Sequence, residues 1–300
     1  MRIGVLGAGA WGTALAHVAR SAGHEVQVWS RGGPLEALGR AQGLILAVPA
    51  QGVREVLLGL KSIVTNAIPL IIGAKGIERG SGLFMNEVVA EVLPAVEPMV
   101  LSGPSFAADV MTGLPTAVVL AAGKISHAHQ WAEALSLPHF RIYASDDVKG
   151  VEIGGALKNV LAIACGISDG RALGDSARAA LTTRGFAELT RFAGKMGAKP
   201  ETLMGLSGLG DLLLTCSSAQ SRNYSFGFAL GEGKTVEQAL AASRGVVEGA
   251  ATVKIAQALA RRHGVDMPIV DAVHAIVDEG KAPGQEIAKL LARPLRAEIT

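Results

Sequence analysis

Short apolar runs alternate with longer helical stretches in the first half of the chain. The runs are rich in aliphatic residues, and we predict strands at residues 2–6, 25–29, 44–48, 70–72, 99–101 and 116–121. A helix is predicted over residues 12–21 and ends near Gly23. Short buried strands that alternate with helices predict a parallel sheet covered on both faces.

The pattern changes after Asp146 and Asp147. Apolar residues then recur at helical spacing, at residues 152–168, 177–196, 235–243, 247–264 and 268–279. No strand is predicted in this half. A chain of 300 residues is long enough for two domains. We predict an α/β domain built on a parallel sheet over residues 1–147, followed by an all-helical domain over residues 148–300.

Glycines follow the first predicted strand at a spacing that suits phosphate binding. The segment GAGAWG at residues 7–12 matches the pattern G-x-G-x-x-G, between a predicted strand and a predicted helix. Gly7 permits the tight turn, Gly9 lets the backbone approach a pyrophosphate, and Gly12 lets helix and strand pack closely. Free N–H groups at the helix N-terminus would bind the anion. The first domain is therefore predicted to be a Rossmann-type dinucleotide-binding domain.

The end of the second predicted strand bears on the choice of nicotinamide cofactor. An acidic residue at that point would bind the ribose hydroxyls of NAD. This chain has Trp29-Ser30-Arg31 instead. No carboxylate repels a 2′-phosphate there, and Arg31 could pair with one. NADP is therefore favoured, NAD remains open, and a solvated loop charge is the alternative for Arg31.

One predicted helix places a lysine in an apolar setting. Residues 151–163 read VEIGGALKNVLAI, so this helix is apolar or small almost all round and should be buried. A buried lysine is costly unless it is paired or used. Lys158 therefore has a partner or a task, or it reaches the surface at a domain edge. Gly154 and Gly155 would let another segment approach the helix closely.

Four further turns combine glycine or proline with polar side chains. They are AKG at residues 74–76, SGPSFA at 102–107, SGLGD at 207–211 and SRNY at 221–224. The first follows a predicted strand, at the edge where open parallel sheets bind ligands. The last lies at a predicted helix N-terminus, which suits an anion.

Taken in order, these segments resemble one family. GAGAWGTALA, AKGIE, SGPSFA, GGALKNVLAI, GLGDLLLTC, QSRN and VVEG together resemble the NAD(P)-dependent glycerol-3-phosphate dehydrogenases of bacteria, from Met1 to about Leu290. The resemblance implies a Rossmann domain and an all-helical domain, with a small phosphorylated substrate bound between them. It implies reversible reduction of dihydroxyacetone phosphate to sn-glycerol 3-phosphate, the backbone precursor of phospholipids.

The resemblance also implies roles for particular residues. Lys158 would donate and accept the proton, with Lys75 and Asp211 as the other catalytic residues. Substrate would be bound by Lys75, Gly103, Ser105, Lys158, Asp211, Ser221, Arg222 and Asn223. NADP or NAD would be bound by Gly7, Gly9, Ala10, Trp11, Gly12, Arg31, Lys75, Ala107, Arg222, Val246 and Glu248. No metal is implied.

The chemistry of carbonyl reduction agrees with these roles. A lysine can deliver the proton when burial and neighbouring cations bring its pKa toward ~7–8, and Lys75 is the candidate neighbouring cation of Lys158. Asp211 would orient the ammonium group. Arg222, in a turn with N–H donors, offers the fixed cation that a substrate phosphate needs.

One segment departs from the family pattern. Members usually have a longer stretch between the second strand and the next, with a helix, a loop and a strand of its own. Here only residues 32–43 fill that gap. The shortened stretch would lie beside the adenine end of the cofactor, so it bears on the preference for NAD or NADP and leaves the catalytic motifs intact.

Composition and charge narrow the other possibilities. The chain is 49% hydrophobic and 18% charged, which suits a large core, and its net charge of +2 gives no case for nucleic acid as a partner. Four glycines between Gly4 and Gly12 argue against an N-terminal signal peptide. No uninterrupted apolar run is long enough to span a bilayer. We expect a cytoplasmic protein without stable membrane insertion, and a homodimer by default.

Cysteines and histidines are not expected to take part in the chemistry. Cys165 and Cys216 lie among apolar or small residues and should be core residues without a disulfide. The histidines lack an acidic partner at a matching motif and should be structural or solvated: His17, His24, His127, His129, His139, His263 and His274.

Two alternatives remain open from the sequence. A related two-domain dehydrogenase of a 3-hydroxyacid or 6-phosphogluconate type shares both domains and often a helical Lys-Asn pair, although the SRN and GLGD turns argue against it. A non-catalytic dinucleotide sensor would keep the fold and lose the chemistry. Lys158, Asp211 and Arg222 are all present, which favours an enzyme.

Overall fold

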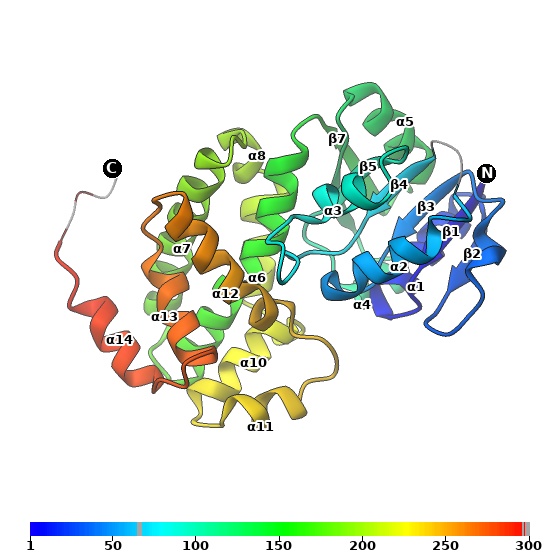
Figure 1. The fold of residues 1–300 in the computed structure, drawn as a ribbon. Coiled ribbons are helices and arrows are strands. Elements are labelled where there is room, and N and C mark those ends of the chain that lie inside the picture. The colour runs from blue at the N-terminus through cyan, green and yellow to red at the C-terminus, as the bar shows by residue number, and fades with distance from the viewer. Residues whose placement is uncertain (65–67, 296, 298–300) are drawn as a thin grey trace.

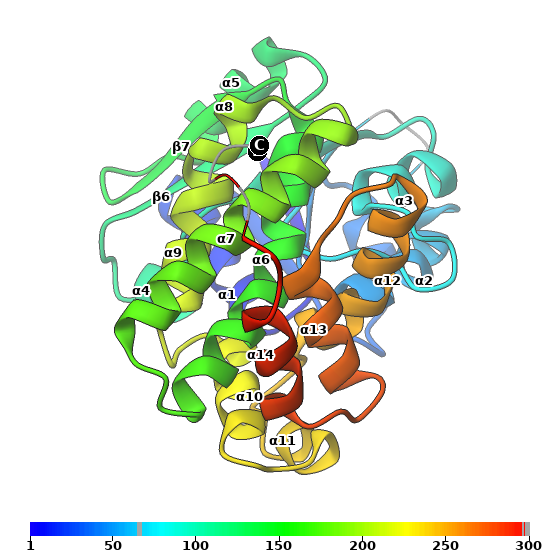
Figure 2. The same ribbon diagram turned by 90° about the vertical axis from the view of Figure 1, so that its left-hand side faces the viewer.

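A computed structural model describes residues 1–64, 68–295 and 297 of the chain. A sheet domain contains the N-terminus, and a helical domain built from the second half of the chain lies beside it (Figure 1). The view turned by 90° shows the helices α7 (Asp175–Lys195), α13 (Pro268–Val277) and α14 (Pro283–Leu291) in front of the long helix α6 (Val148–Gly170) (Figure 2).

Seven strands form one sheet. They are β1 (Arg2–Leu6), β2 (Glu25–Trp29), β3 (Gly43–Leu46), β4 (Pro69–Ile72), β5 (Glu97–Ser102), β6 (Thr116–Ala121) and β7 (Phe140–Ser145). Their order across the sheet is β2-β1-β3-β4-β5-β6-β7. The strand pairs are parallel except for β5 and β6, which are antiparallel. The predicted parallel sheet is confirmed, with one antiparallel pair near its β7 edge.

The sequence pattern misses β7 and overextends β3. β7 lies at the edge of the sheet and alternates buried or half-buried residues with exposed ones, so it lacks the continuous apolar run that marks the inner strands. β3 ends at Leu46, two residues before the predicted end, and the chain turns away ahead of Pro49.

Helices cover both faces of the sheet, as predicted. They are α1 (Ala10–Ser21), α2 (Val53–Leu60), α3 (Met85–Val92), α4 (Ala107–Met111) and α5 (Ile125–Leu135), with the 3-10 turns η1 (Leu35–Leu38) and η2 (Ala50–Gly52). Apolar residues of α1, α4 and α5 form one core with Ile3 and Val5 of the sheet. Those of α2 and α3 form a second core with Leu6 and Leu44, on the opposite face of the same strands.

The described chain after Ser145 is helical, with no strand among its described residues. Its helices are α6 (Val148–Gly170), α7 (Asp175–Lys195), α8 (Pro200–Met204), the π-helical turn η3 (Leu206–Gly210), α9 (Asp211–Cys216), α10 (Arg222–Gly231), α11 (Val236–Ala241), α12 (Glu248–Arg262), α13 (Pro268–Val277) and α14 (Pro283–Leu291). The five predicted helices correspond to α6, α7, α11, α12 and α13. The start of α10 is where the sequence predicts a helix N-terminus, at residues 221–224. The helices α8, α9 and α14 are not predicted, because each has fewer than ten residues.

The helix α6 is the centre of the helical domain and is buried over almost its whole length. Glycines let neighbours approach it closely. A Cβ atom at Gly166 would lie 2.1 Å from the carbonyl oxygen of Tyr224 on α10. At Gly154 it would lie 2.6 Å from the carbonyl oxygen of Ser207. By length and mean hydropathy α6 could cross a membrane, but here it is enclosed by the protein.

Two buried glutamates hold the starts of helices from other parts of the chain. The carboxyl group of Glu152 on α6 accepts a hydrogen bond of 2.9 Å from the backbone N–H of Asn86, at the start of α3. Glu188 on α7 accepts one of 2.9 Å from Ile269, at the start of α13. Burial raises the pKa of both carboxyls to about 8. Glu152 thereby joins the helical domain to the sheet domain.

The strand β2 forms an outer edge of the sheet. The chain between β2 and β3 contains only η1 and turns, so no further strand covers this edge. Gly32 in that turn has φ +88°, a conformation that glycine adopts readily. The short stretch noted in the sequence is therefore accommodated without loss of the central strands.

Candidate active site

A cavity of about 440 Å³ opens where the carboxyl ends of the strands face the helical domain. It is lined by the turns after β1, β3, β4 and β5 and by segments of α6, α9, α10 and α12. The structure brings these residues of the predicted site together around it: Gly9, Ala10, Trp11, Lys75, Ser105, Ala107, Lys158, Asp211, Ser221, Arg222, Asn223, Val246 and Glu248. Gly7, Gly12, Gly103 and Arg31 do not line it.

The turn between β1 and α1 leaves room for an anion. Gly7 has φ +120° and lies against Ala47, and a Cβ at Gly12 would lie 1.9 Å from the carbonyl oxygen of Gly7. These two glycines shape the turn. A Cβ at Gly9 would meet no atom within 4 Å, so the side facing the cavity is open. No side chain caps the N-terminus of α1, and its first turn contains no acidic residue, so its N–H groups are available to a pyrophosphate.

Two buried polar atoms of the cavity have no hydrogen-bond partner among the described residues. They are Nε1 of Trp11 and Oε2 of Glu248. The other oxygen of Glu248 accepts a hydrogen bond of 3.1 Å from the backbone N–H of Ala50, which ties α12 to the sheet domain. Burial raises the pKa of Glu248, while the hydrogen bond from the Ala50 N–H and the charge of Arg222 act to lower it. An unpaired donor, an unpaired acceptor and an open glycine turn fit a dinucleotide with an amide and hydroxyl groups.

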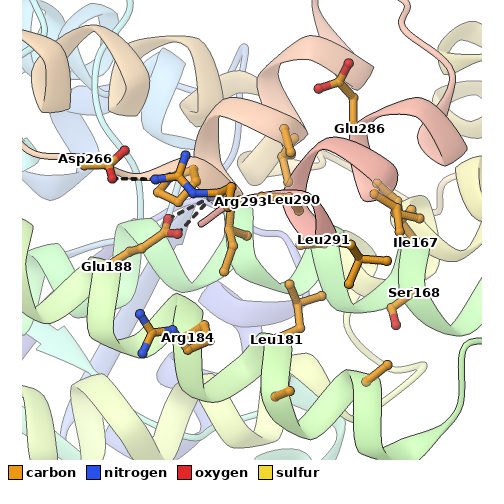
Figure 3. Close-up of a pocket in the computed structure, with 18 of the residues that line it drawn as sticks. Ile167, Ser168, Leu181, Arg184, Glu188, Asp266, Glu286, Leu290, Leu291 and Arg293 are labelled. Carbon is orange, nitrogen blue, oxygen red and sulfur yellow. Dashed lines mark hydrogen bonds and ion pairs between the residues drawn. The ribbon is translucent and has the colours of Figure 1, made fainter. Parts of the chain in front are cut away.

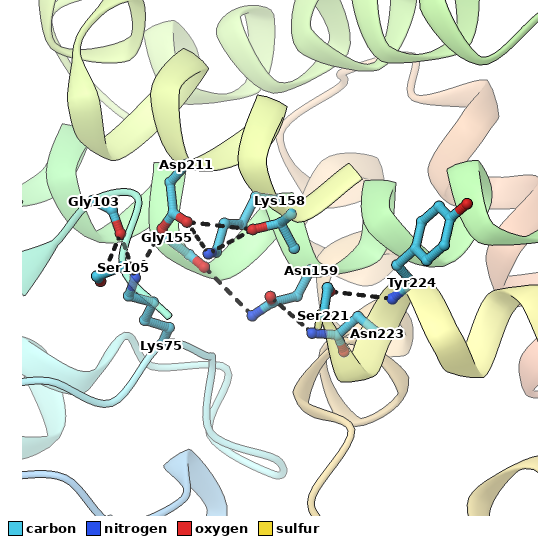
Figure 4. A network of polar contacts seen from close by, with 11 residues as sticks. Lys75, Gly103, Ser105, Gly155, Lys158, Asn159, Asp211, Ser221, Asn223 and Tyr224 are labelled. Carbon is cyan, nitrogen blue, oxygen red and sulfur yellow. Dashed lines mark hydrogen bonds and ion pairs between the residues drawn. The ribbon is translucent and has the colours of Figure 1, made fainter. Parts of the chain in front are cut away.

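A buried carboxylate between two lysines forms the centre of the cavity (Figure 4). Lys158 on α6 donates to Oδ1 of Asp211 and, at 2.9 Å, to the hydroxyl of Thr215. Lys75, after β4, donates to Oδ2 of the same carboxylate at 2.8 Å and to the carbonyl oxygen of Gly103 at 3.1 Å. The side chain of Lys158 is 8% exposed, so it does not reach the surface.

Burial controls the charges of this group. Burial lowers the pKa of Lys158 to about 8; the charge of Lys75 acts in the same direction, and Asp211 opposes both. Burial acts to raise the pKa of Asp211, but the two lysines outweigh it and hold the pKa below its ordinary value. At neutral pH, Lys158 can therefore both hold a proton and release it, beside a carboxylate that stays ionised.

Glycines in α6 and in the turn after β5 allow the lysines and the carboxylate to approach one another. A Cβ at Gly155 would lie 2.6 Å from the hydroxyl of Ser102 and 3.5 Å from the side chain of Lys75. Gly103 has φ +143°, and its carbonyl oxygen accepts from both Lys75 and, at 3.0 Å, the hydroxyl of Ser105. Gly103 therefore contributes through its backbone, although it does not line the cavity.

A chain of amides joins the lysine helix to α10 and α12 (Figure 4). Asn223 donates to Asn159 at 2.9 Å and accepts from the backbone N–H of Gly249 at 2.8 Å. Ser221 caps α10 by accepting from the N–H of Tyr224 at 3.2 Å. Sequence reasoning misses Asn159 and Thr215. Their sequence positions could have indicated them, since Asn159 directly follows Lys158 and Thr215 lies one helical turn after Asp211.

Arg31 lies apart from the cavity. It follows β2, and Nη2 of its guanidinium would lie 3.9 Å from a Cβ atom at Gly52, in the turn after β3. The side chain thus reaches across the end of β1, which lies between β2 and β3 in the sheet.

A second, larger cavity of about 1040 Å³ lies in the helical domain, away from the glycine turn (Figure 3). Leu181 and Glu188 of α7 line one side, and Leu290 and Leu291 of α14 line another. It contains none of the predicted catalytic or binding residues.

The cysteines and histidines are largely as expected. Cys165 and Cys216 are free and buried. No described histidine lines the active-site cavity. Two histidines have acidic neighbours outside the predicted motifs: Nδ1 of His127 lies 2.7 Å from Glu97, and Nδ1 of His274 lies 3.4 Å from Glu279. No group of His, Cys, Asp or Glu that could hold a metal occurs in the described part of the chain.

Comparison with known proteins identifies the family. The family model described as NAD-dependent glycerol-3-phosphate dehydrogenase C-terminus matches residues 147–288, and the corresponding N-terminus model matches residues 2–33 and 34–128. The chain belongs to the NAD-dependent glycerol-3-phosphate dehydrogenase family. The interruption of the N-terminal match falls at the short turn between β2 and β3, where the sequence departs from the family pattern.

Relatives of this family match along nearly the whole chain. The chain is 48% identical to a glycerol-3-phosphate dehydrogenase [NAD(P)+] of Parvibaculum lavamentivorans, over 99% of this chain and 98% of that protein. It is 52% identical to the protein of that name from Methylobacterium radiotolerans, with the same coverage. The crystal structure of glycerol-3-phosphate dehydrogenase from Coxiella burnetii is 40% identical, covers 97% of this chain and 99% of that one, and has a TM-score of 0.94.

Proposed function

We propose that the protein transfers a hydride between NAD(P)H and dihydroxyacetone phosphate and so forms sn-glycerol 3-phosphate, reversibly. The observation that supports this most strongly is the pairing of Lys158 and Lys75 with one buried carboxylate, Asp211. This group faces the same cavity as the open glycine turn. A proton donor and a dinucleotide site in one enclosed space are what carbonyl reduction requires.

NAD(P)H, when bound, supplies the hydride to the carbonyl carbon of the substrate. Lys158 donates a proton to the carbonyl oxygen and takes it back in the reverse reaction. Lys75 keeps a positive charge beside that oxygen and stabilises the negative charge that develops there. Asp211 remains ionised, holds both ammonium groups in place and balances their charge. Thr215 fixes the rotamer of Lys158 through its hydrogen bond of 2.9 Å.

The substrate phosphate is bound at the N-terminus of α10. Arg222 supplies a guanidinium at the rim of the cavity, and Ser221 and Asn223 flank it. A guanidinium at the start of a helix of ten residues suits a phosphate dianion. Gly103 and Ser105 place the substrate against Lys75, and the position of Ala107 suits contact with the cofactor.

NADP is proposed as the preferred cofactor, since Ser30 and Arg31 stand where an acidic residue would favour NAD. The remaining cofactor contacts are assigned to Gly7, Gly9, Ala10, Trp11, Gly12, Val246 and Glu248. The protein is proposed to work in the cytoplasm.

A homodimer is also proposed. Leu291 and Leu295 are 81% and 101% exposed, and both border the apolar cavity of Figure 3. Protruding leucines beside an apolar hollow on one face are complementary to a second copy related by a twofold axis. Replacing both leucines with Ser should shift the sedimentation coefficient toward that of a monomer, and an unchanged coefficient would reject this interface.

The activity is tested with purified protein in a spectrophotometric assay of NADPH and NADH oxidation. Dihydroxyacetone phosphate should be reduced, and unphosphorylated dihydroxyacetone at the same concentration should not. Equal rates with both ketones would refute phosphate recognition. Turnover of 3-hydroxyacids or 6-phosphogluconate in place of these substrates would favour the related dehydrogenase type, and cofactor binding without turnover of any substrate would favour a sensor.

A further inference from the structure

The rim of the active-site cavity contains a second arginine that the proposed function leaves without a role. Arg244 lies in the loop between α11 and α12 and lines the cavity together with Arg222. The two lysines of the cavity are both paired with Asp211. Neither the side chain of Arg222 nor that of Arg244 forms a hydrogen bond or an ion pair with any of the described residues.

The loop holds Arg244 close to Arg222. Gly245 has φ +141°, and a Cβ atom there would lie only 3.1 Å from Nη1 of Arg222. The guanidinium of Arg222 therefore lies against Gly245, and the Cα atom of Gly245 is about 3.8 Å from that of Arg244. The hydroxyl of Ser243 donates to the carbonyl oxygen of Gly245 at 3.0 Å, which fixes the turn around Arg244.

Two unpaired cations at one rim repel each other unless an anion lies between them. The charge of Glu248 acts on Arg222, but its carboxyl group forms no ion pair with either arginine, because one oxygen accepts from the backbone N–H of Ala50 and the other is buried without a partner. A phosphate dianion has enough oxygen atoms to accept hydrogen bonds from two guanidinium groups at once.

We propose that Arg244 is a second phosphate-binding residue, which binds the phosphate of the substrate together with Arg222. This inference rests on the proposed function, because it assigns the bound phosphate to the substrate. Glycine suits position 245, because its φ of +141° is one that other residues rarely adopt and a Cβ there would crowd the Arg222 guanidinium.

The test is the variant Arg244→Gln, which removes the charge from an exposed loop residue. We expect the KM for dihydroxyacetone phosphate to rise about 5- to 20-fold, with the KM for NADPH changed less than twofold. Arg262→Gln is the matched control, because it removes one exposed arginine from the far end of α12. A rise in the NADPH KM alone would overturn the assignment to the substrate phosphate, and kinetics equal to those of the control would overturn any binding role.

A double-mutant cycle with Arg222→Gln tests the shared ligand. Two residues that grip one phosphate should show a combined effect that differs from the product of the single effects. Independent effects would overturn the two-arginine grip. If the wild-type protein does not turn over dihydroxyacetone phosphate, the proposed function fails. The anion site can then still be tested by the melting temperature of the protein, which sn-glycerol 3-phosphate should raise and glycerol should not. Equal stabilisation of wild type and Arg244→Gln by that ligand would overturn the proposal.

Discussion

Lys158 and Asp211 form an ion pair in the interior of the helical domain, and Thr215 completes the contacts of the lysine. The sequence left a choice between a buried lysine with a partner and one that extends to the surface. The structure shows the first. Because Lys75 shares the same carboxylate, the three side chains carry a net charge of one positive unit when both lysines are protonated.

Lys158→Met should lower turnover by ~10²–10⁴-fold, because it removes the general acid and keeps most of the packing volume. NADPH binding should persist, since the glycine turn lies in the other domain. Asp211 keeps Lys75 as a partner, so the loss of stability should be about 1–3 kcal/mol, below that of fully breaking a buried pair. Steady-state rates and cofactor fluorescence measure these effects. Turnover at the wild-type rate would show that another group delivers the proton.

The pH dependence should have opposite signs in the two directions. Reduction needs protonated Lys158, so kcat/KM for dihydroxyacetone phosphate should fall as the pH rises through about 8. Oxidation of sn-glycerol 3-phosphate needs the neutral amine, so its rate should rise through the same pH. Asp211→Asn removes an opposite charge and should move both midpoints to lower pH. Profiles with the same sign in both directions would argue against a single acid–base group.

Arg222→Lys should raise the KM for dihydroxyacetone phosphate about 10-fold despite the retained charge. A lysine offers a point charge and lacks the two parallel donors of a guanidinium. Initial-rate kinetics at saturating NADPH measure this effect, with Arg262→Lys as the control on an exposed helix end. An unchanged KM and kcat/KM would remove Arg222 from the phosphate site.

Arg31→Ala should weaken the use of NADPH about 10-fold and that of NADH less than threefold. The reason is the loss of a cation that pairs with a 2′-phosphate. The ratio of the two kcat/KM values, before and after the change, is the measurement. Equal losses, or a wild-type preference for NADH, would show that this residue does not select the cofactor.

Glu152→Gln should stabilise the protein at pH 8 by about 1–3 kcal/mol and have little effect at pH 5. The pKa of Glu152 is raised to about 8 in the fold. Between the ordinary carboxyl pKa and this value, the unfolded chain is ionised while the folded one holds its proton, so stability falls as the pH rises. Glutamine keeps an acceptor for the Asn86 N–H and has no proton to lose. Thermal melts at both pH values measure this, with the exposed Glu133→Gln as control, and equal shifts at both values would contradict it.

Local rules were sufficient for some parts of this fold. The turn at Gly7, Gly9 and Gly12 follows from the glycine spacing alone and lies between β1 and α1 as predicted, although Gly7 also packs against Ala47 of a later segment. The burial of the helix that contains Lys158 also follows from its apolar residues, whereas the burial of the lysine itself stayed open. Its pairing with Asp211, 53 residues further on, depends on how α9 packs against α6, and only the family resemblance indicated it.

Other parts depend on contacts that no local pattern contains. β7 gains its place from its register with β6, since its own residues alternate in polarity. Asn159 and Asn223 act through each other and through Gly249, three segments that meet only in the folded chain. For Arg31, the position after β2 is predictable from the sequence. The direction of its side chain toward Gly52 is not, because it depends on the short turn that follows.

That turn also has a practical use in protein engineering. A Cβ atom at Gly32 would meet nothing within 4 Å, and the turn lies at the open edge of the sheet on the far side of β1 from β3 and β4. Exposed turns of this kind tolerate inserted sequence. The turn is therefore a suitable insertion site. The longer stretch of a relative or a reporter domain could be inserted there without displacing Lys158, Lys75 and Asp211.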